Sequence, residues 1–312
     1  LLRTHEINAL SKGKLGLQVY DVKVAFDDIK ISIDFNKIYD YMTVNKYQAL
    51  DKASNGLLVN GMADFSILAS TKGYTLSLKS KKIAILAKTS EFNLSQGCCS
   101  DGVYIYGAIR NSDETGVIIR KHKLSDGSYV ATSKVLFLGH GNDLTYDSKN
   151  NRIVCARGGT LGNELIFIDP NTLTITGSVT IDTYAGAITY NEKYDCYAIS
   201  RGGKTLEILN SNFEVIKSYT RTDSTGYTAQ GMGSDDNYIY FPMSYQDKKN
   251  VIVVYDWYGN YIMTIQSDVT REAESMFWVN GKYYFAHNYY LEGMNVWEGT
   301  FKISWFEHLD SK

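Results

Sequence analysis

The sequence predicts an all-β protein in which residues 76–312 form a five-bladed β-propeller. The 312 residues include 25 Tyr and 26 Gly but only 2 Pro, a composition typical of half-buried strands joined by glycine turns. One sequence pattern recurs at intervals of 46, 44, 44 and 44 residues. It consists of a small or polar residue, an apolar pair, a turn and a strand. Its copies start at Gln96, Asn142, Gly186, Gln230 and Glu274. A period in the forties with about four strands per period is typical of propeller blades.

Each copy repeats the same elements in the same order. A turn such as Ser100–Gly102 or Asn280–Lys282 separates a first strand from a second, which predicts a β-hairpin. The expected second strands are residues 103–106, 152–155, 194–197, 238–241 and 283–286. The expected third strands are residues 116–119, 164–167, 205–208, 251–254 and 300–303. An outer strand follows in every copy except the last, which ends near Glu307.

The missing outer strand has a candidate upstream of the first copy. Residues Lys82–Lys88 form an apolar run with a lysine at each end and lie where other copies have the outer strand of their predecessor. We expect this segment to pair with the last blade and close the ring, because closure removes an open sheet edge.

Residues 1–75 have a different pattern and are expected to form a separate, small mixed α/β appendage. Alternating residues over 22–33 predict strands, and a weak helical stripe runs from Ile38 to Leu58. We interpret this appendage as an attachment or oligomerisation segment and not as a sixth blade.

The composition argues against several classes of function. A net charge of -2, from 32 basic and 34 acidic residues, argues against a broad surface for nucleic acid. The sequence has no run of eighteen apolar residues, so we expect no membrane insertion. Cys98, Cys99, Cys155 and Cys196 form no CxxC pair, and their setting predicts core filling, with no metal and no cofactor.

Polar residues stand at the start of most of the predicted inner strands. In a propeller, this end of the inner strands surrounds the opening of the central channel. These residues are Gln96, Asn142, Asp143, Gln230 and Glu274, with Gly186 leaving a space in the third copy. Such side chains can hydrogen-bond a ligand, or they can cap strand ends and hold channel water. Both interpretations remain open.

Arginines recur just after the second strands. Arg110, Arg157 and Arg201 occupy matching places in the first three copies, and glycine pairs follow Arg157 and Arg201. Three guanidinium groups on one rim would form a local site for phosphate or carboxylate, because arginine offers a planar fork of donors. The alternative is that each arginine pairs with a neighbouring acid and ties blades together.

The same rim position in the last two copies carries aromatic and imidazole groups. We expect Tyr245, Tyr289 and His287 to belong to the ligand-binding set, with the tyrosines stacking on sugar rings. His140, in Gly139–Asp143, is interpreted as a structural histidine.

No motif of nucleophilic or metal-assisted hydrolysis appears in the sequence, so we name no catalytic residue and expect binding more than catalysis. Asp143 and Glu274 leave one enzymatic alternative open, since both could face one channel as the carboxyl pair of a glycosidase.

The phrases Gln96-Gly97, Gly139-His140-Gly141-Asn142-Asp143-Leu144-Thr145-Tyr146 and Gln230-Gly231-Met232 resemble those of a known group. From about Leu76 onward the chain resembles the propeller of phage tail receptor-binding proteins that attack Gram-positive bacteria. It is also similar to helveticin J-type bacteriocins and to phage proteins called teichoic acid biosynthesis protein C. The resemblance covers about three-quarters of the chain and carries no ligand residues with it.

The resemblance implies a host-attachment module on a tail fibre that binds wall teichoic acid or another cell-wall glycan. It also implies a homotrimer, contacts with other tail proteins, and a place in the virion tail or outside the cell. Two alternatives remain, an enzyme that cuts the same polymer and a secreted bacteriocin-like protein that acts alone.

Overall fold

The computed structural model describes residues 58–59, 62–63, 69, 74–201, 204–246 and 249–305. The described chain is all-β, with strands and turns almost throughout and one short 3-10 turn at Gly159–Leu161. Strands β1 (Leu58–Val59) and β2 (Met62–Ala63) form a small antiparallel pair. The elements predicted between residues 22 and 57 lie outside the described residues, and the predicted boundary at residue 75 remains a prediction.

Three four-stranded antiparallel sheets follow the predicted repeats. The first contains β4 (Leu94–Ser100), β5 (Tyr104–Arg110), β6 (Val117–Lys123) and β7 (Tyr129–Thr132). The second contains β8 (Asp143–Asp147), β9 (Arg152–Ala156), β10 (Glu164–Ile168) and β11 (Ile175–Thr180). The third contains β12 (Ala187–Asn191), β13 (Cys196–Ser200), β14 (Thr205–Leu209) and β15 (Val215–Thr220).

The remaining strands belong to one nine-stranded sheet with two antiparallel regions. The β16–β20 region contains β16 (Thr228–Ala229), β17 (Gly233–Ser234), β18 (Tyr238–Tyr245), β19 (Lys249–Asp256) and β20 (Tyr261–Gln266). The β21–β3 region contains β21 (Glu272–Val279), β22 (Lys282–Tyr289), β23 (Gly293–Trp305) and β3 (Tyr74–Ala87). A single parallel pair, Gln266 with Ser77, joins the two regions.

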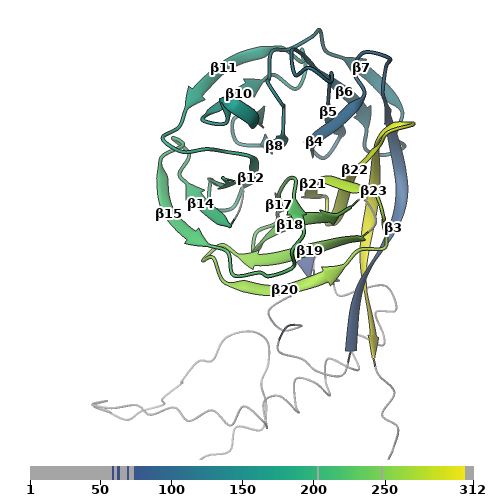
Figure 1. The fold of residues 1–312 in the computed structure, drawn as a ribbon, viewed down its shortest axis with the longest axis vertical. Coiled ribbons are helices and arrows are strands. Elements are labelled where there is room, and N and C mark those ends of the chain that lie inside the picture. The colour runs from purple at the N-terminus through teal and green to yellow at the C-terminus, as the bar shows by residue number, and fades with distance from the viewer. Residues whose placement is uncertain are drawn as a thin grey trace, which may run out of the picture. The chain divides into compact units, whose positions relative to one another are not determined.

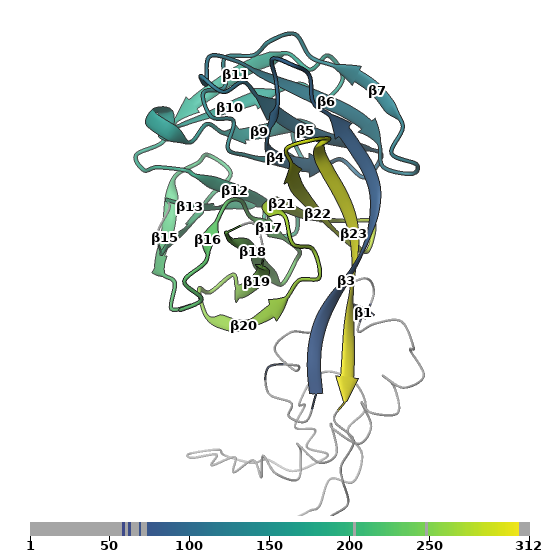
Figure 2. The same cartoon turned by 45° about the vertical axis from the view of Figure 1, so that its right-hand side comes forward.

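Strand β3 is the N-terminal strand that the sequence placed beside the last repeat. It lies antiparallel to β23, in a register that runs from Gly293↔Ala87 to Trp305↔Tyr74 (Figure 2). The sequence predicted the third strand of the last repeat at residues 300–303, and this prediction was wrong in register. The strand begins at Gly293, and β22 pairs with its residues Gly293–Gly299. Strand β23 continues beyond that pairing because β3 is long enough to accompany it.

The sheets are arranged around a central axis as in a β-propeller. Strands β4, β8, β12, β17 and β21 lie innermost (Figure 1). Within the described residues, the buried apolar side chains form five clusters, each between neighbouring sheets or regions. One cluster, for example, joins Val154 and Leu165 of the second sheet to Ile188 and Ile199 of the third. The apolar faces of adjacent sheets therefore cover each other, which supplies the main stabilisation of the ring.

Turn carboxylates add polar ties between adjacent sheets. Asp147 is fully buried and accepts a hydrogen bond from the Tyr197 hydroxyl of the third sheet at 2.5 Å. Asp235 accepts one from the Tyr283 hydroxyl of β22 at 2.8 Å. These side chains explain part of the high tyrosine content, because each ring fills the core while its hydroxyl pairs with a buried carboxylate.

Candidate functional site

The carboxylate of Asp143 lies where the innermost strands meet. Its Oδ1 accepts hydrogen bonds from the Leu144 N–H at 3.0 Å and from the Ser275 hydroxyl at 2.8 Å. Its Oδ2 accepts from the backbone N–H groups of Ile188 at 3.0 Å and Met232 at 2.9 Å. The donors come from the second sheet, the third sheet and both regions of the nine-stranded sheet. Strand β4 is equally close, since a Cβ on Gly97 would stand 2.4 Å from the Asp143 Cα.

Burial dominates the electrostatics of this carboxylate. Asp143 is fully buried, and desolvation raises its pKa to about 8 although the four donors act in the opposite direction. Both of its oxygens are engaged by protein groups. Asp143 was expected among the ligand-binding residues, and the structure places it inside the ring as a polar tie between the innermost strands.

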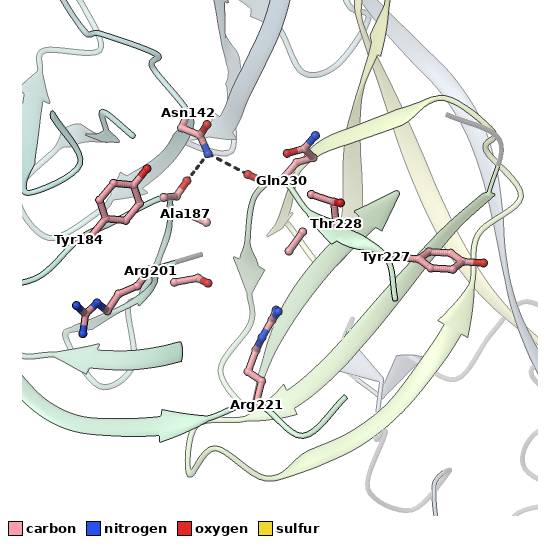
Figure 3. Close-up of a pocket in the computed structure, with 11 residues that line it drawn as sticks. Asn142, Tyr184, Ala187, Arg201, Arg221, Tyr227, Thr228 and Gln230 are labelled. Atoms are coloured by element: carbon pink, nitrogen blue, oxygen red, sulfur yellow. Dashed lines mark hydrogen bonds between the residues drawn. The ribbon is translucent and has the colours of Figure 1, made fainter. Parts of the chain in front are cut away.

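Its neighbour Asn142 faces a pocket. The Asn142 side-chain amide donates to the carbonyl oxygens of Gly186 and of Gln230, the latter at 3.1 Å (Figure 3). It therefore bridges the starts of the third and fourth repeats. We call the cavity beside it the Asn142 pocket, with a volume of ≈ 450 Å³. Its lining residues are Asn142, Tyr184, Gly186, Ala187, Ser200, Arg201, Arg221, Tyr227, Thr228, Ala229 and Gln230.

Two arginines give the pocket its charge. Arg201 follows β13, its side chain is 50% exposed, and its Nη1 lies 3.8 Å from a carboxylate oxygen of Glu207. Arg221 follows β15 and is buried, with its guanidinium carbon 4.1 Å from the centre of the Phe241 ring and its Nε 3.6 Å from Asp223. Burial lowers the pKa of Arg221. Figure 3 shows its guanidinium directed toward the part of the pocket bounded by Asn142 and Gln230.

Each of these arginines pairs with an acid that also accepts hydrogen bonds from hydroxyl groups. Glu207 also accepts hydrogen bonds from Thr183 at 2.6 Å and from Ser218 at 3.4 Å. Asp223 accepts one from the Tyr255 hydroxyl at 2.8 Å. Neither acid is among the described residues that line the pocket. The lining itself therefore contributes two guanidinium groups and no carboxylate, while Glu207 and Asp223 pair with these arginines from outside the lining, and such a lining suits an anionic ligand.

Tyr184 and Tyr227 line the same pocket from opposite sides, and Figure 3 shows the Tyr227 ring directed away from Asn142 and Arg221. The Tyr184 ring lies against Gly162, where a Cβ would stand 2.1 Å from the ring, so this close approach requires glycine. Tyr227 stacks on Tyr245, with ring centres 5.4 Å apart and planes inclined by 28°. Tyr245, which the sequence placed at the rim, is 45% exposed and thus extends the Tyr227 wall outward.

The other two rim arginines have different surroundings. Arg157 forms an ion pair with Glu164 and donates to the Phe137 carbonyl at 3.1 Å. Arg110 donates to the Asn111 carbonyl at 3.0 Å and lies 3.8 Å from Glu114. Of the three recurring arginines, the structure brings only Arg201 into the Asn142 pocket. Arg157 fits the alternative in which an arginine pairs with a neighbouring acid, and Arg110 and Arg201 also lie 3.8 Å from an acid, Glu114 and Glu207.

The polar residues of the last repeat form a network beside Gln230. The Gln230 amide donates to Glu272 at 2.7 Å, and Asn288 and Tyr290 donate to the same carboxylate at 3.3 and 3.2 Å. Glu274 is buried next to this group. Desolvation first, and then the charge of Glu272 together with a hydrogen bond to it, raises the pKa of Glu274 well above its usual value.

The remaining predicted site residues lie apart from the pocket. Gln96 is buried and donates to the Ser95 carbonyl at 2.7 Å. His287 is buried, its Nδ1 donates to the Arg271 carbonyl at 3.1 Å, and desolvation lowers its pKa to about 4. Tyr289 lies beneath the guanidinium of Arg271, whose carbon is 5.2 Å from the ring centre.

Sequence reasoning missed Arg221, Tyr184 and Tyr227. A signal for Arg221 did exist in the repeats. The backbone N–H groups of Ile181, Arg221 and Ser267 make the same bond, each to a carbonyl near the start of the third strand of its repeat. A charged residue at a place where another repeat has a buried isoleucine is a reason to suspect a site.

Metal-binding groups, cysteines and membrane-spanning helices were sought among the described residues. They contain no group of three or more His, Cys, Asp or Glu side chains that could hold a metal ion. All four cysteines are buried and free. None of the described helical segments has the length and apolar character needed to cross a membrane.

Comparisons with known proteins place the fold. No protein-family model matches the sequence, and no curated protein matches it. The structure is similar to Myxococcus xanthus glutaminyl cyclase, with a TM-score of 0.54 and 12% identity, over 74% of this chain and 99% of that one. Two weaker similarities are to Kuenenia stuttgartiensis hydrazine synthase and to the Myceliophteria thermophila Cps50 (Swd1) β-propeller domain. Their TM-scores are 0.40 and 0.41, with 10% and 8% identity, over 64% and 70% of this chain and 57% and 99% of those chains. At these identities the likeness is one of fold alone.

Proposed function

We propose that this chain is a recognition module that binds an anionic glycan in the Asn142 pocket. The observation that carries the proposal is the pairing of Arg201 and Arg221 in one cavity of ≈ 450 Å³, a size in the usual range for small-ligand sites. Arg201 is half exposed and can meet the ligand at the mouth, while Arg221 is buried deeper in the wall.

The lining suits a phosphorylated or carboxylated sugar polymer. A guanidinium binds phosphate oxygens through paired N–H donors. The Tyr184 ring offers its surface to a sugar inside the pocket, and the exposed Tyr245, stacked on Tyr227, offers ring surface beside it. One repeat unit in the pocket and the next on the tyrosine wall would account for both features.

The biological setting follows from the sequence resemblance. In this proposal the module belongs to a phage tail receptor-binding protein and attaches the virion to wall teichoic acid, whose phosphodiesters match the arginines. Residues 1–75 would join it to other tail proteins as a homotrimer. The proposal includes a five-bladed ring closed by β3, which the antiparallel pairing of β3 with β23 and the five apolar clusters support.

Sedimentation with cell walls tests the proposal. The purified chain is mixed with Gram-positive walls that retain or lack their teichoic acid, and Arg201→Glu is compared with the wild type. We expect the wild type to sediment only with walls that retain the polymer and Arg201→Glu to stay in solution. Equal sedimentation of both proteins with both walls would contradict the proposal.

A hydrolase that cuts the same polymer is the second candidate, and the contact between Glu272 and Glu274 favours it. A carboxyl group whose pKa is raised by burial, as that of Glu274 is, can act as a general acid beside a second carboxylate. Glu274 would donate a proton to the leaving oxygen, while Glu272 would accept one from the attacking water. Time-dependent release of soluble fragments, lost in Glu274→Gln, would favour this candidate, whereas binding without release favours the recognition module.

A further inference from the structure

A second pocket opens at the opposite ends of the strands, where the first sheet meets the β21–β3 region. We call it the Leu124 pocket, and its volume is ≈ 430 Å³. Its floor and walls come from the β4–β5 turn at Gly102 and Val103, the β21–β22 turn at Asn280, and the residues that follow β6. It shares no lining residue with the Asn142 pocket.

The turn after the third strand explains why a cavity exists at this junction. In four repeats one residue of this turn has a positive φ and donates its N–H to the residue that begins the turn. These residues are Gly127, Leu173, Phe213 and Gly259, with φ of 70°, 55°, 65° and 78°. Leu173 and Phe213 are buried and pack into the apolar clusters between sheets. In the second and third sheets, this position therefore fills the junction.

The turns at Gly127 and Gly259 lack a side chain at this position, and they differ in which neighbouring residue fills the junction. Beside Gly259, Trp257 is buried among Cys196 and Ala198 of the neighbouring sheet and donates its indole N–H to the Asp235 carbonyl at 3.2 Å. In the first sheet, Leu124 stands where Trp257 stands in the β16–β20 region. Leucine is much smaller than tryptophan, so the space at this junction stays open.

Gly127 cannot carry a side chain that would fill the space. A Cβ at this residue would stand 2.3 Å from the Ile83 carbonyl oxygen of β3. Two hydrogen bonds join the segments that line the cavity, because Asn280 donates to the Gly102 carbonyl at 2.7 Å and the Leu124 N–H donates to the Val103 carbonyl at 2.9 Å.

The lining offers donors and acceptors side by side. Lys282 Nζ lies 3.0 Å from both carboxylate oxygens of Glu298, so a cation and an anion stand together on one wall. Tyr104 and Tyr284 line the pocket as well, and burial raises the pKa of Tyr284 to about 12, so it remains a hydroxyl donor. The 60% exposed side chain of Val103 adds an apolar surface.

We propose that the Leu124 pocket is a second binding site, for an uncharged saccharide ring. Each sugar hydroxyl both donates and accepts, so it can pair with the neighbouring ammonium and carboxylate of Lys282 and Glu298. The Glu298 carboxylate opposes an anionic ligand here, in contrast to the Asn142 pocket with its two arginines. The site adds to the proposed function and does not depend on it.

Two exposed valines provide a matched test. Val103→Trp places an indole in the Leu124 pocket, whereas Val215→Trp adds the same bulk on β15, where Val215 is 41% exposed. Ligand-observed NMR would be recorded with methyl α-D-glucopyranoside, methyl β-D-galactopyranoside and N-acetyl-D-glucosamine. We expect at least one of these sugars to bind the wild type, Val215→Trp and Arg201→Ala, and binding to fall at least tenfold in Val103→Trp.

Two results would overturn the proposal. One is that none of the three sugars binds the wild type. The other is that Val103→Trp binds as well as Val215→Trp does. Since Arg201→Ala alters only the Asn142 pocket, loss of an anionic ligand in that variant with retention of the sugar would show that the two sites are separate.

Discussion

The Ser275 hydroxyl donates a hydrogen bond to Asp143 Oδ1 at 2.8 Å and so joins the β21–β3 region to the second sheet at the axis of the ring. The same hydroxyl lies 3.0 Å from the carbonyl oxygen of Cys98 in β4. Together with the N–H donors of Ile188 and Met232, this contact makes one buried carboxylate the meeting point of the innermost strands.

Replacement of this carboxylate by an amide should be costly. In Asp143→Asn at pH 9, where the wild-type carboxyl is ionised, one side-chain oxygen becomes an NH₂ group that faces two donors, so two buried hydrogen bonds are lost. We expect a loss of about 3 kcal/mol or more in the free energy of unfolding, because each unsatisfied buried donor costs about 1–3 kcal/mol. Urea unfolding measures it. Ser275→Ala removes one donor and should cost less, and an equal or smaller loss in Asp143→Asn would contradict the central role.

The same group predicts how stability depends on pH. The pKa of Asp143 is about 8 in the folded protein, above the value of about 3.9 for an unfolded chain. The folded state therefore binds this proton more tightly, and the stabilisation declines as pH rises from about 4 through about 8. Burial raises the pKa of Glu274 in the same direction. We expect the difference in unfolding free energy between wild type and Asp143→Asn to shrink from pH 6 to pH 9, and a growing difference would contradict this.

His287 acts with the opposite sign. Desolvation lowers its pKa to about 4 in the folded protein, below the unfolded value of about 6.5. Its contribution is present above pH 6.5 and is lost as pH falls through about 4, because only the unfolded state readily accepts the proton. His287→Asn removes the titration, so the wild type should lose stability relative to this variant between pH 6.5 and pH 4. Parallel pH curves for the two proteins would show that His287 does not contribute.

A pair of glycines tests the packing of β3 on the first sheet. Gly127 and Gly226 both have φ of 70°, so alanine at either position carries a backbone cost of about 1–2 kcal/mol. A Cβ at Gly226 would meet nothing within 4 Å, whereas one at Gly127 would stand 2.3 Å from the Ile83 carbonyl oxygen. We expect thermal unfolding to show a clearly larger loss for Gly127→Ala. Equal losses would mean that β3 does not pack there in solution.

The ties between turn carboxylates and tyrosines should also be measurable. Tyr197→Phe leaves Asp147 fully buried with one donor fewer, and we expect a loss of about 1–2 kcal/mol in unfolding free energy. Tyr190→Phe is the control, because its hydroxyl bonds Asp195, an acid of the same sheet whose side chain is 25% exposed. An equal loss of unfolding free energy in Tyr190→Phe and Tyr197→Phe would contradict a stabilising contact between the sheets at Tyr197.

The sequence was most informative about the repeats. Turn residues such as Asp101-Gly102 and Asn280-Gly281 mark hairpins locally, so the hairpins and their spacing could be predicted, as could the strand at Lys82–Lys88 from its place before the first copy. Pairing partners were harder, because β23 continues past its contact with β22 only where the distant β3 accompanies it.

The candidate site was predictable only in part. Arg157 and Arg201 recur at the same rim position, so the sequence could mark that position. It could not show that Arg157 pairs with Glu164, which lies across the turn that follows β9. Arg221 and Tyr184 reach the pocket from segments before the next inner strand, and only the exchange of the buried Ile181 of one repeat for Arg221 in the next marks this place. Their role depends on how neighbouring sheets meet, which local patterns do not encode.

The most direct test of the central claim compares two arginines that the sequence alone treats as equivalent. Isothermal titration with a poly(glycerol phosphate) oligomer would be performed on the wild type, Arg201→Ala and Arg157→Ala. Loss of a charge-assisted contact of about 1.5–3 kcal/mol in Arg201→Ala predicts binding at least tenfold weaker, while Arg157→Ala should lose stability and keep its affinity. Unchanged binding in Arg201→Ala, or equal weakening in both variants, would contradict the assignment of the Asn142 pocket as the site of an anionic ligand.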